Sequence, residues 1–136
     1  MTEYKGTAAS VVLRSDGIIE FIPNEEWDQP DTLELATEIL DIAKKLTVDQ
    51  PRGIIAVVPT RYLPKEILSY YQNTEVGDVA RALVLDSFAA KVIGNLYFQL
   101  SKGKPNEAGR IIPTKLFTDK QIAIEWLLQQ MAKYKV

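Results

Sequence analysis

The segment Gly53-Ile54-Ile55-Ala56-Val57-Val58-Pro59 decides the fold. It is apolar without interruption, and four of its residues are β-branched. A strand that is buried on both faces has this composition, because parallel sheets are covered by helices on both sides. Pro59 lacks a backbone N–H and ends the run. We therefore expect residues 54–58 to form a central strand of a mostly parallel sheet.

A β-hairpin is expected before this strand. Residues 8–14 and 18–22 have the composition of strands, and Ser15-Asp16-Gly17 separates them. Asp-Gly is a strong hairpin signal because glycine adopts a positive φ at little cost. Pro23 ends the second of these stretches. The sheet should therefore open with two antiparallel strands.

The rest of the chain predicts helices that alternate with strands. A helix at 32–47, capped by Asp31 or Thr32, has its apolar residues on one broad stripe. The later elements are, in order, a helix at 64–73, a strand at 79–85, a helix at 88–102, a strand at 111–117 and a final helix opened by a capping box of Thr118 and Gln121. Pro113 cannot donate to a neighbouring strand, so the strand at 111–117 should lie at a sheet edge.

These elements predict an α/β fold in one domain. The chain has 136 residues, of which 46% are apolar, and both values are ordinary for a globular domain. The element order is ββαβαβαβα, and alternation of strands and helices implies crossover connections in a mostly parallel sheet. We expect a mixed sheet of five strands with four helices packed on it and a core over about residues 8–132.

The composition excludes several functions. The chain has no cysteine and no histidine, which rules out disulfides, thiolate zinc sites and a histidine-based hydrolytic triad. We expect no metal, no cofactor and no enzymatic activity. The net charge is −2, and the nine acidic residues between Asp16 and Asp41 would repel nucleic acid. No apolar run approaches the ~20 residues of a membrane span, and no signal peptide is evident, so we expect a cytoplasmic protein.

Three motifs in the C-terminal half carry a family resemblance. They are Arg81-Ala82-Leu83-Val84-Leu85-Asp86-Ser87, Ile93-Gly94-Asn95-Leu96-Tyr97-Phe98, and Pro113-Thr114-Lys115-Leu116-Phe117-Thr118-Asp119 followed by Ala123, Trp126 and Leu127. The sequence resembles the SpoIIAA-like group, whose fold is shared with STAS domains. The likeness runs from about Ala8 to Leu128 and is nearest to small stand-alone bacterial members of unknown function. It implies that residues 1–136 form one SpoIIAA-like domain.

The resemblance implies a fold more than an activity. Anti-sigma antagonists of this fold carry an Asp-Ser pair after their central strand, and a partner kinase phosphorylates the serine. The corresponding segment here is Pro59-Thr60-Arg61-Tyr62-Leu63-Pro64, so the pair is absent and a switch of that kind is not expected. Asp86-Ser87 is such a pair, but it follows a different strand. Other relatives with a similar sheet bind hydrophobic ligands or lipids.

We expect the functional surface at the carboxyl ends of two parallel strands. In open α/β sheets ligands bind outside such ends. The expected cap of the helix at 64–73 is Leu63, whose side chain cannot accept a hydrogen bond, so the first amides of that helix would favour an anion. The candidate residues are Thr60, Arg61, Asp86, Ser87 and Lys91. The simpler alternatives are that water or Thr60 satisfies these amides, and that Asp86 and Ser87 only cap the next helix.

Two functions are favoured at this point, and a third, an enzyme that uses carboxylate, lysine or tyrosine side chains alone, ranks below them. The first is a non-enzymatic regulatory or binding module that acts through a protein partner or a small acidic or apolar ligand. The alternative is a small-molecule or lipid carrier with an apolar pocket between helix and sheet. A deep apolar cavity would favour the carrier, and a flat patch of exposed aromatic side chains would favour a protein partner. We also expect a homodimer through the helix at 88–102.

Overall fold

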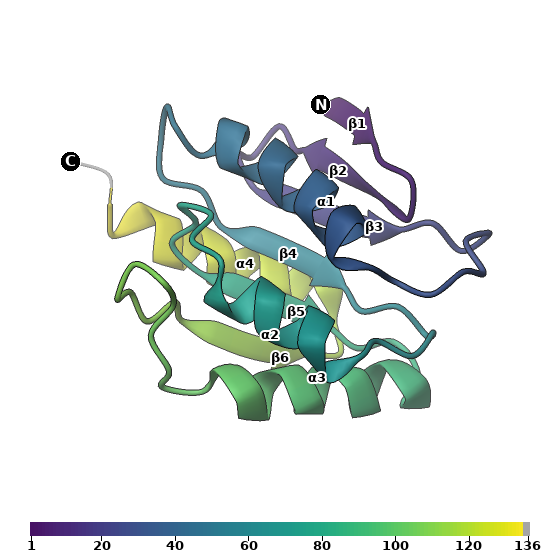
Figure 1. Cartoon of the computed structure of the whole chain (residues 1–136). Coiled ribbons are helices and arrows are strands. Elements are labelled where there is room, and N and C mark those ends of the chain that lie inside the picture. The colour runs from purple at the N-terminus through teal and green to yellow at the C-terminus, as the bar shows by residue number, and fades with distance from the viewer. Residues whose placement is uncertain (135–136) are drawn as a thin grey trace.

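One six-stranded sheet runs through the protein, whose computed structural model describes residues 1–134. The strands are β1 (Thr2–Lys5), β2 (Ala9–Leu13), β3 (Ile19–Pro23), β4 (Ile54–Val57), β5 (Arg81–Val84) and β6 (Thr114–Phe117). They lie side by side in the order of the chain, as Figure 1 shows. The pairs β1–β2 and β2–β3 are antiparallel, and the strands from β3 to β6 are parallel.

Four helices cover the two faces of this sheet unequally. They are α1 (Leu33–Leu46), α2 (Lys65–Asn73), α3 (Phe88–Ser101) and α4 (Lys120–Ala132). Right-handed crossovers place α1, α2 and α3 on one face, because the strand order advances in a single direction from β3 to β6 (Figure 1). Along β5, Leu83 packs in a cluster with residues of α2 and α3, whereas its neighbour Val84 packs with residues of α4. Since neighbouring strand residues point to opposite faces, α4 covers the other face alone.

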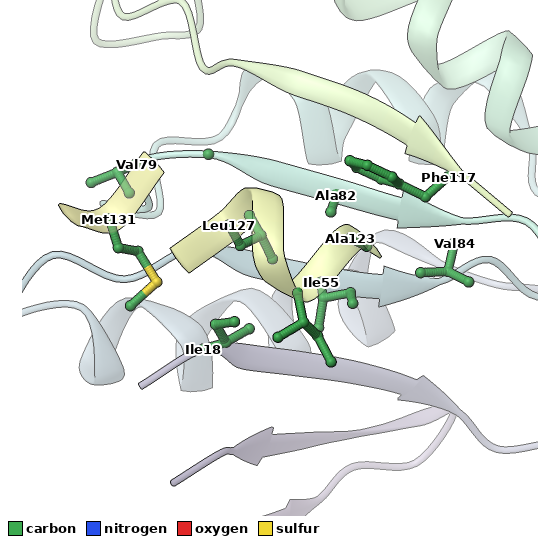
Figure 2. Packing of buried hydrophobic residues seen from close by; sticks show 11 residues of the cluster. Ile18, Ile55, Val79, Ala82, Val84, Phe117, Ala123, Leu127 and Met131 are labelled. Atoms are coloured by element: carbon green, nitrogen blue, oxygen red, sulfur yellow. The ribbon is translucent and has the colours of Figure 1, made fainter. Parts of the chain in front are cut away.

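The packing of α4 against the sheet forms one of the clusters of the core. Leu127 is fully buried and meets Ile55 of β4 and Ala82 of β5 in one cluster (Figure 2). Gly53 lets the helix approach closely, because a Cβ atom at this position would lie 2.8 Å from Leu127 Cδ2. None of the helices within residues 1–134 is both long and apolar enough to cross a bilayer.

Several expectations for individual elements are confirmed. The hairpin forms between β2 and β3, and Gly17 has the positive φ of 90° that its turn requires. Strand β4 is internal and pairs with β3 and β5, while β6 forms one edge of the sheet directly after Pro113. Thr32 caps α1, because its hydroxyl accepts a hydrogen bond from the Leu35 amide at 3.2 Å.

The expected count of five strands is wrong, because β1 adds a sixth. All four residues of β1 are exposed, and backbone pairing with β2 holds the strand in place. Because neither face of β1 is buried, its sequence lacks the alternation of apolar and polar residues that marks a strand. The capping box expected at Thr118 is also wrong. Asp119 is the cap of α4, and its carboxylate accepts hydrogen bonds from the amides of Gln121 and Ile122. An ionised side chain at this position also interacts favourably with the helix dipole.

Candidate functional site

A cavity of about 130 Å³ lies between the sheet and the helices α1, α2 and α3. Most of its lining is apolar and includes Phe21, Leu40, Ala56, Leu68, Leu83 and Ile93. The strand register explains why space is left here. Ala56 of β4 lies between Phe21 of β3 and Leu83 of β5, so the middle strand contributes a methyl group where its neighbours contribute large side chains.

The end of the cavity near the start of β5 holds a buried ion pair. Arg81 Nε donates to Asp78 Oδ2 at 2.7 Å and Arg81 Nη2 to Asp78 Oδ1 at 3.2 Å. Arg81 Nη1 donates to the Tyr97 hydroxyl and to the Tyr71 carbonyl, both at 2.8 Å. Burial lowers the pKa of Arg81, but the Asp78 carboxylate and the Tyr97 hydroxyl together outweigh it and raise this pKa. All three nitrogens of the Arg81 guanidinium therefore donate hydrogen bonds, and the charged group is held in place at this end of the cavity.

The opposite end of the cavity holds a second ion pair. Arg61 follows β4 and Asp31 follows β3, so both lie in loops at the carboxyl ends of parallel strands. Arg61 Nε donates to Asp31 Oδ2 at 2.8 Å, and Arg61 Nη2 donates to Asp31 Oδ1 at 3.1 Å. Arg61 Nη2 also lies 3.4 Å from the carbonyl of Ala8. This two-point contact joins three segments of the chain and compensates the charge of both side chains.

The hydroxyl of Tyr71 is the polar group of the lining that has no partner among the described residues. The neighbouring hydroxyls of Tyr70 and Tyr97 each have one, the Thr37 hydroxyl at 2.7 Å and Arg81 at 2.8 Å. Burial raises the pKa of the Tyr71 phenol, and the nearby Asp31 carboxylate raises it further. Tyr71 therefore keeps its proton and presents a hydrogen-bond donor to the cavity.

Of the residues expected at the functional surface, only Arg61 lines this cavity. Ser87 caps α3, and its hydroxyl accepts a hydrogen bond from the Ala90 amide at 3.0 Å, so the simpler interpretation of this residue is confirmed. Thr60, Asp86 and Lys91 are exposed.

The start of α2 offers less to an anion than its sequence indicates. The helix begins at Lys65, one residue later than expected, and its cap Pro64 makes no side-chain hydrogen bond. The Pro64 carbonyl accepts from the amides of Ile67 and Leu68, as it should at a regular helix start. Because Asp31 neutralises Arg61, an acidic ligand would meet no free positive charge at this residue.

Sequence reasoning missed three of the residues that shape the site. Asp31 was expected only as a helix cap, and Tyr71 only as one of two adjacent aromatic residues. Ala56 did carry a signal, because it is the one small side chain in the apolar run at 54–58. Among the described residues, no three acidic side chains lie close enough together to hold a metal ion.

The outer face of α3 forms an exposed apolar stripe, which consists of Phe88, Val92 and Leu96. These residues are four positions apart and therefore share one face of the helix. Phe88 is 84% exposed. The 14 residues of α3 include a single charged side chain, Lys91. The opposite face of α3 contributes Ile93 to the cavity, so this helix separates the cavity from the stripe.

The sequence from residue 14 to residue 131 matches the model of a family described as a domain of unknown function, DUF7793. The chain belongs to this family. The DUF7793 match covers every element from β3 to α4 except the last residue of α4. It therefore includes every element that lines the cavity except β2.

A crystal structure of a protein with unknown function from Arthrobacter sp. FB24 is similar to this DUF7793 chain. The two are 21% identical, the alignment covers 91% of this chain and 96% of the other, and the TM-score is 0.31. Among curated proteins none matches the sequence.

Proposed function

We propose that this protein is a cytoplasmic, non-enzymatic binding module whose ligand is a small, largely apolar molecule held between the sheet and α1 to α3. The cavity of about 130 Å³ carries this proposal. An apolar cavity of about 150 Å³ in another protein stays dry and binds benzene, so the space here suits a molecule of about one ring. Larger ligands need pockets of about 300 Å³ or more.

Binding fits the lining better than catalysis does. The charged groups that line the cavity are Asp31, Arg61 and Arg81, and each is held in an ion pair. A reaction would need two convergent titratable groups that are free to exchange protons with a substrate. Groups locked in two-point ion pairs instead shape a rigid wall around a ligand.

The proposal includes kinship with the SpoIIAA-like group. What supports it is the order of elements, since from β2 onward the chain follows the ββαβαβαβα order that the sequence motifs led us to expect. Binding of a small apolar ligand agrees with what relatives of that group with a similar sheet do. Regulation through such a ligand is then the role that the module would serve.

Ligand-induced stabilisation tests the proposal. Toluene should raise the midpoint of thermal unfolding in a concentration-dependent way, because a ligand that binds only the folded state stabilises it by mass action. The variant Ala56→Ile fills the cavity and should abolish this response. The control Ala132→Leu adds volume at an exposed position of α4 and should retain it. An equal response in both variants would show that toluene binds elsewhere.

Self-association through α3 is a second candidate, favoured by the exposed stripe of Phe88, Val92 and Leu96. A helix with one charge among 14 residues can pack against its own symmetry copy without burying many unpaired charges. Light scattering should then give a dimer mass that Val92→Glu reduces to a monomer mass. A monomer mass for the unaltered protein at high concentration would contradict this candidate.

A further inference from the structure

We propose that the ligand of this cavity is uncharged and carries a hydrogen-bond acceptor, such as a carbonyl oxygen, that accepts a hydrogen bond from the Tyr71 hydroxyl. This inference rests on the proposed function above and names the class of ligand. Three observations support it: an unused donor in the wall, charges that cancel within the wall, and the size of the space.

The unused donor is the first observation. The side chain of Tyr71 lines the cavity, and its hydroxyl meets no hydrogen-bond partner among residues 1–134, although Tyr70 beside it and Tyr97 on α3 both have one. The Tyr71 side chain is half-buried, and its hydroxyl is not one of the fully buried polar atoms that lack a partner, so a ligand acceptor would replace water at this donor. A ligand oxygen is therefore the partner that would complete the hydrogen bonding of this wall. Because the phenol keeps its proton, it can donate a hydrogen bond, and a ligand acceptor such as a carbonyl oxygen fits this donor.

The balance of charge is the second observation. At one end of the cavity Asp31 neutralises Arg61, and at the other Asp78 neutralises Arg81. An anionic or cationic ligand would bring a charge into an apolar space in which no free counter-charge remains. Burying such a charge is strongly unfavourable. An uncharged ligand avoids this cost.

The space itself is the third observation. The volume of about 130 Å³ admits about one ring and little more. Between its two polar ends the cavity is walled by Phe21, Ala56 and Leu83 from three neighbouring strands. A planar apolar body fits this middle region, and a single polar substituent can then reach Tyr71. An aromatic aldehyde, ketone or ester of one ring has this combination.

A series of one-ring compounds that differ only in their substituent tests the inference. The probes are toluene, benzaldehyde, benzoate and benzylammonium, with affinities measured by NMR titration of the full chain. Benzaldehyde should bind about two- to tenfold more tightly than toluene, which is what one neutral hydrogen bond contributes. The two ions should bind more weakly than toluene.

Two variants assign this difference to Tyr71. Tyr71→Phe should bring the affinity for benzaldehyde down to that for toluene and leave the toluene affinity unchanged. Tyr70→Phe removes the neighbouring hydroxyl, which bonds to Thr37 and lies outside the cavity lining, and should leave the preference intact. The comparison of the four probes on the unaltered protein stands even if a variant folds poorly.

The outcomes separate this inference from the proposed function. If toluene binds but benzaldehyde binds no better, or if its advantage survives Tyr71→Phe, the cavity is a ligand site and the inference on ligand class is wrong. If benzoate binds most tightly, the ligand is an anion that displaces Asp31 from Arg61, and the inference is again wrong. If none of the four compounds binds, both the inference and the proposed function fall.

Discussion

Replacing Ala56 with isoleucine should stabilise the protein, although the change adds bulk at a partly buried position. A cavity costs about 24 cal/mol per Å³, so the 130 Å³ here corresponds to a ceiling of about 3 kcal/mol. Isoleucine adds three carbons, each worth about 0.8 kcal/mol when buried, and loses about 0.5–1 kcal/mol of side-chain entropy. We therefore expect a gain of about 1–2 kcal/mol, within the usual range for cavity filling.

Urea unfolding measures this gain, and a neighbouring alanine supplies the matched control. Ala82 of β5 is fully buried on the α4 face in the cluster around Leu127. The same substitution, Ala82→Ile, should destabilise the protein by about 1–3 kcal/mol because it overpacks a filled core. The two substitutions are chemically identical and lie on adjacent strands, so β propensity changes both alike.

The reasoning is refuted if the two variants shift the free energy of unfolding in the same direction. A loss of stability in Ala56→Ile would mean that the space beside this residue is already filled by neighbouring side chains. A gain in Ala82→Ile would mean that the core under α4 is looser than its buried cluster indicates. Either result would remove the cavity as the basis for ligand binding.

Three further predictions concern stability. Asp78→Ala should lower the free energy of unfolding by about 3–5 kcal/mol, because it leaves Arg81 charged and unpaired inside the protein. The double change Asp78→Leu with Arg81→Met should recover most of this loss, as measured by urea unfolding. A loss below about 1 kcal/mol for the single change would contradict this expectation. Hydrogen bonds from Arg110 lower the pKa of Glu75 from 4.5 to about 2, so this carboxylate stabilises the fold above pH 4.5 and its contribution is lost as the pH falls towards 2. Unfolding measured at several pH values should show a smaller acid loss in Glu75→Gln, and an unchanged loss would mean that the pair contributes nothing. Gly17→Val should cost about 1–2 kcal/mol in thermal unfolding, because a β-branched residue is strained at a positive φ; an unchanged midpoint would mean that the turn relaxes to a negative φ.

Elements with a buried face could be predicted from their apolar pattern. Strand β4 is recognisable because both of its faces are covered, and the β2–β3 hairpin because Asp16 and Gly17 mark its turn. Strand β1 could not be predicted. Its sequence Thr-Glu-Tyr-Lys is exposed throughout, and it is defined by backbone pairing with β2, which any polar segment can supply.

The site was only partly predictable, because it depends on contacts between distant residues. Arg61 was expected at the end of a central strand, where loops meet in open α/β sheets. Its partner Asp31 lies 30 residues earlier in the chain, and no local pattern joins the two. The cavity depends on the register that sets Ala56 between Phe21 and Leu83, which a single strand does not reveal.

The contact of Arg61 with Asp31 and the Ala8 carbonyl also bears on how fast a ligand is exchanged. A molecule that passes between the loops that carry Arg61 and Asp31 separates them, and their separation breaks two charge-assisted hydrogen bonds at once. The free-energy barrier on this route sets the rates of binding and release, whereas the apolar contacts in the cavity set the affinity. A molecule of one ring that takes this route can therefore bind weakly and still have a long residence time.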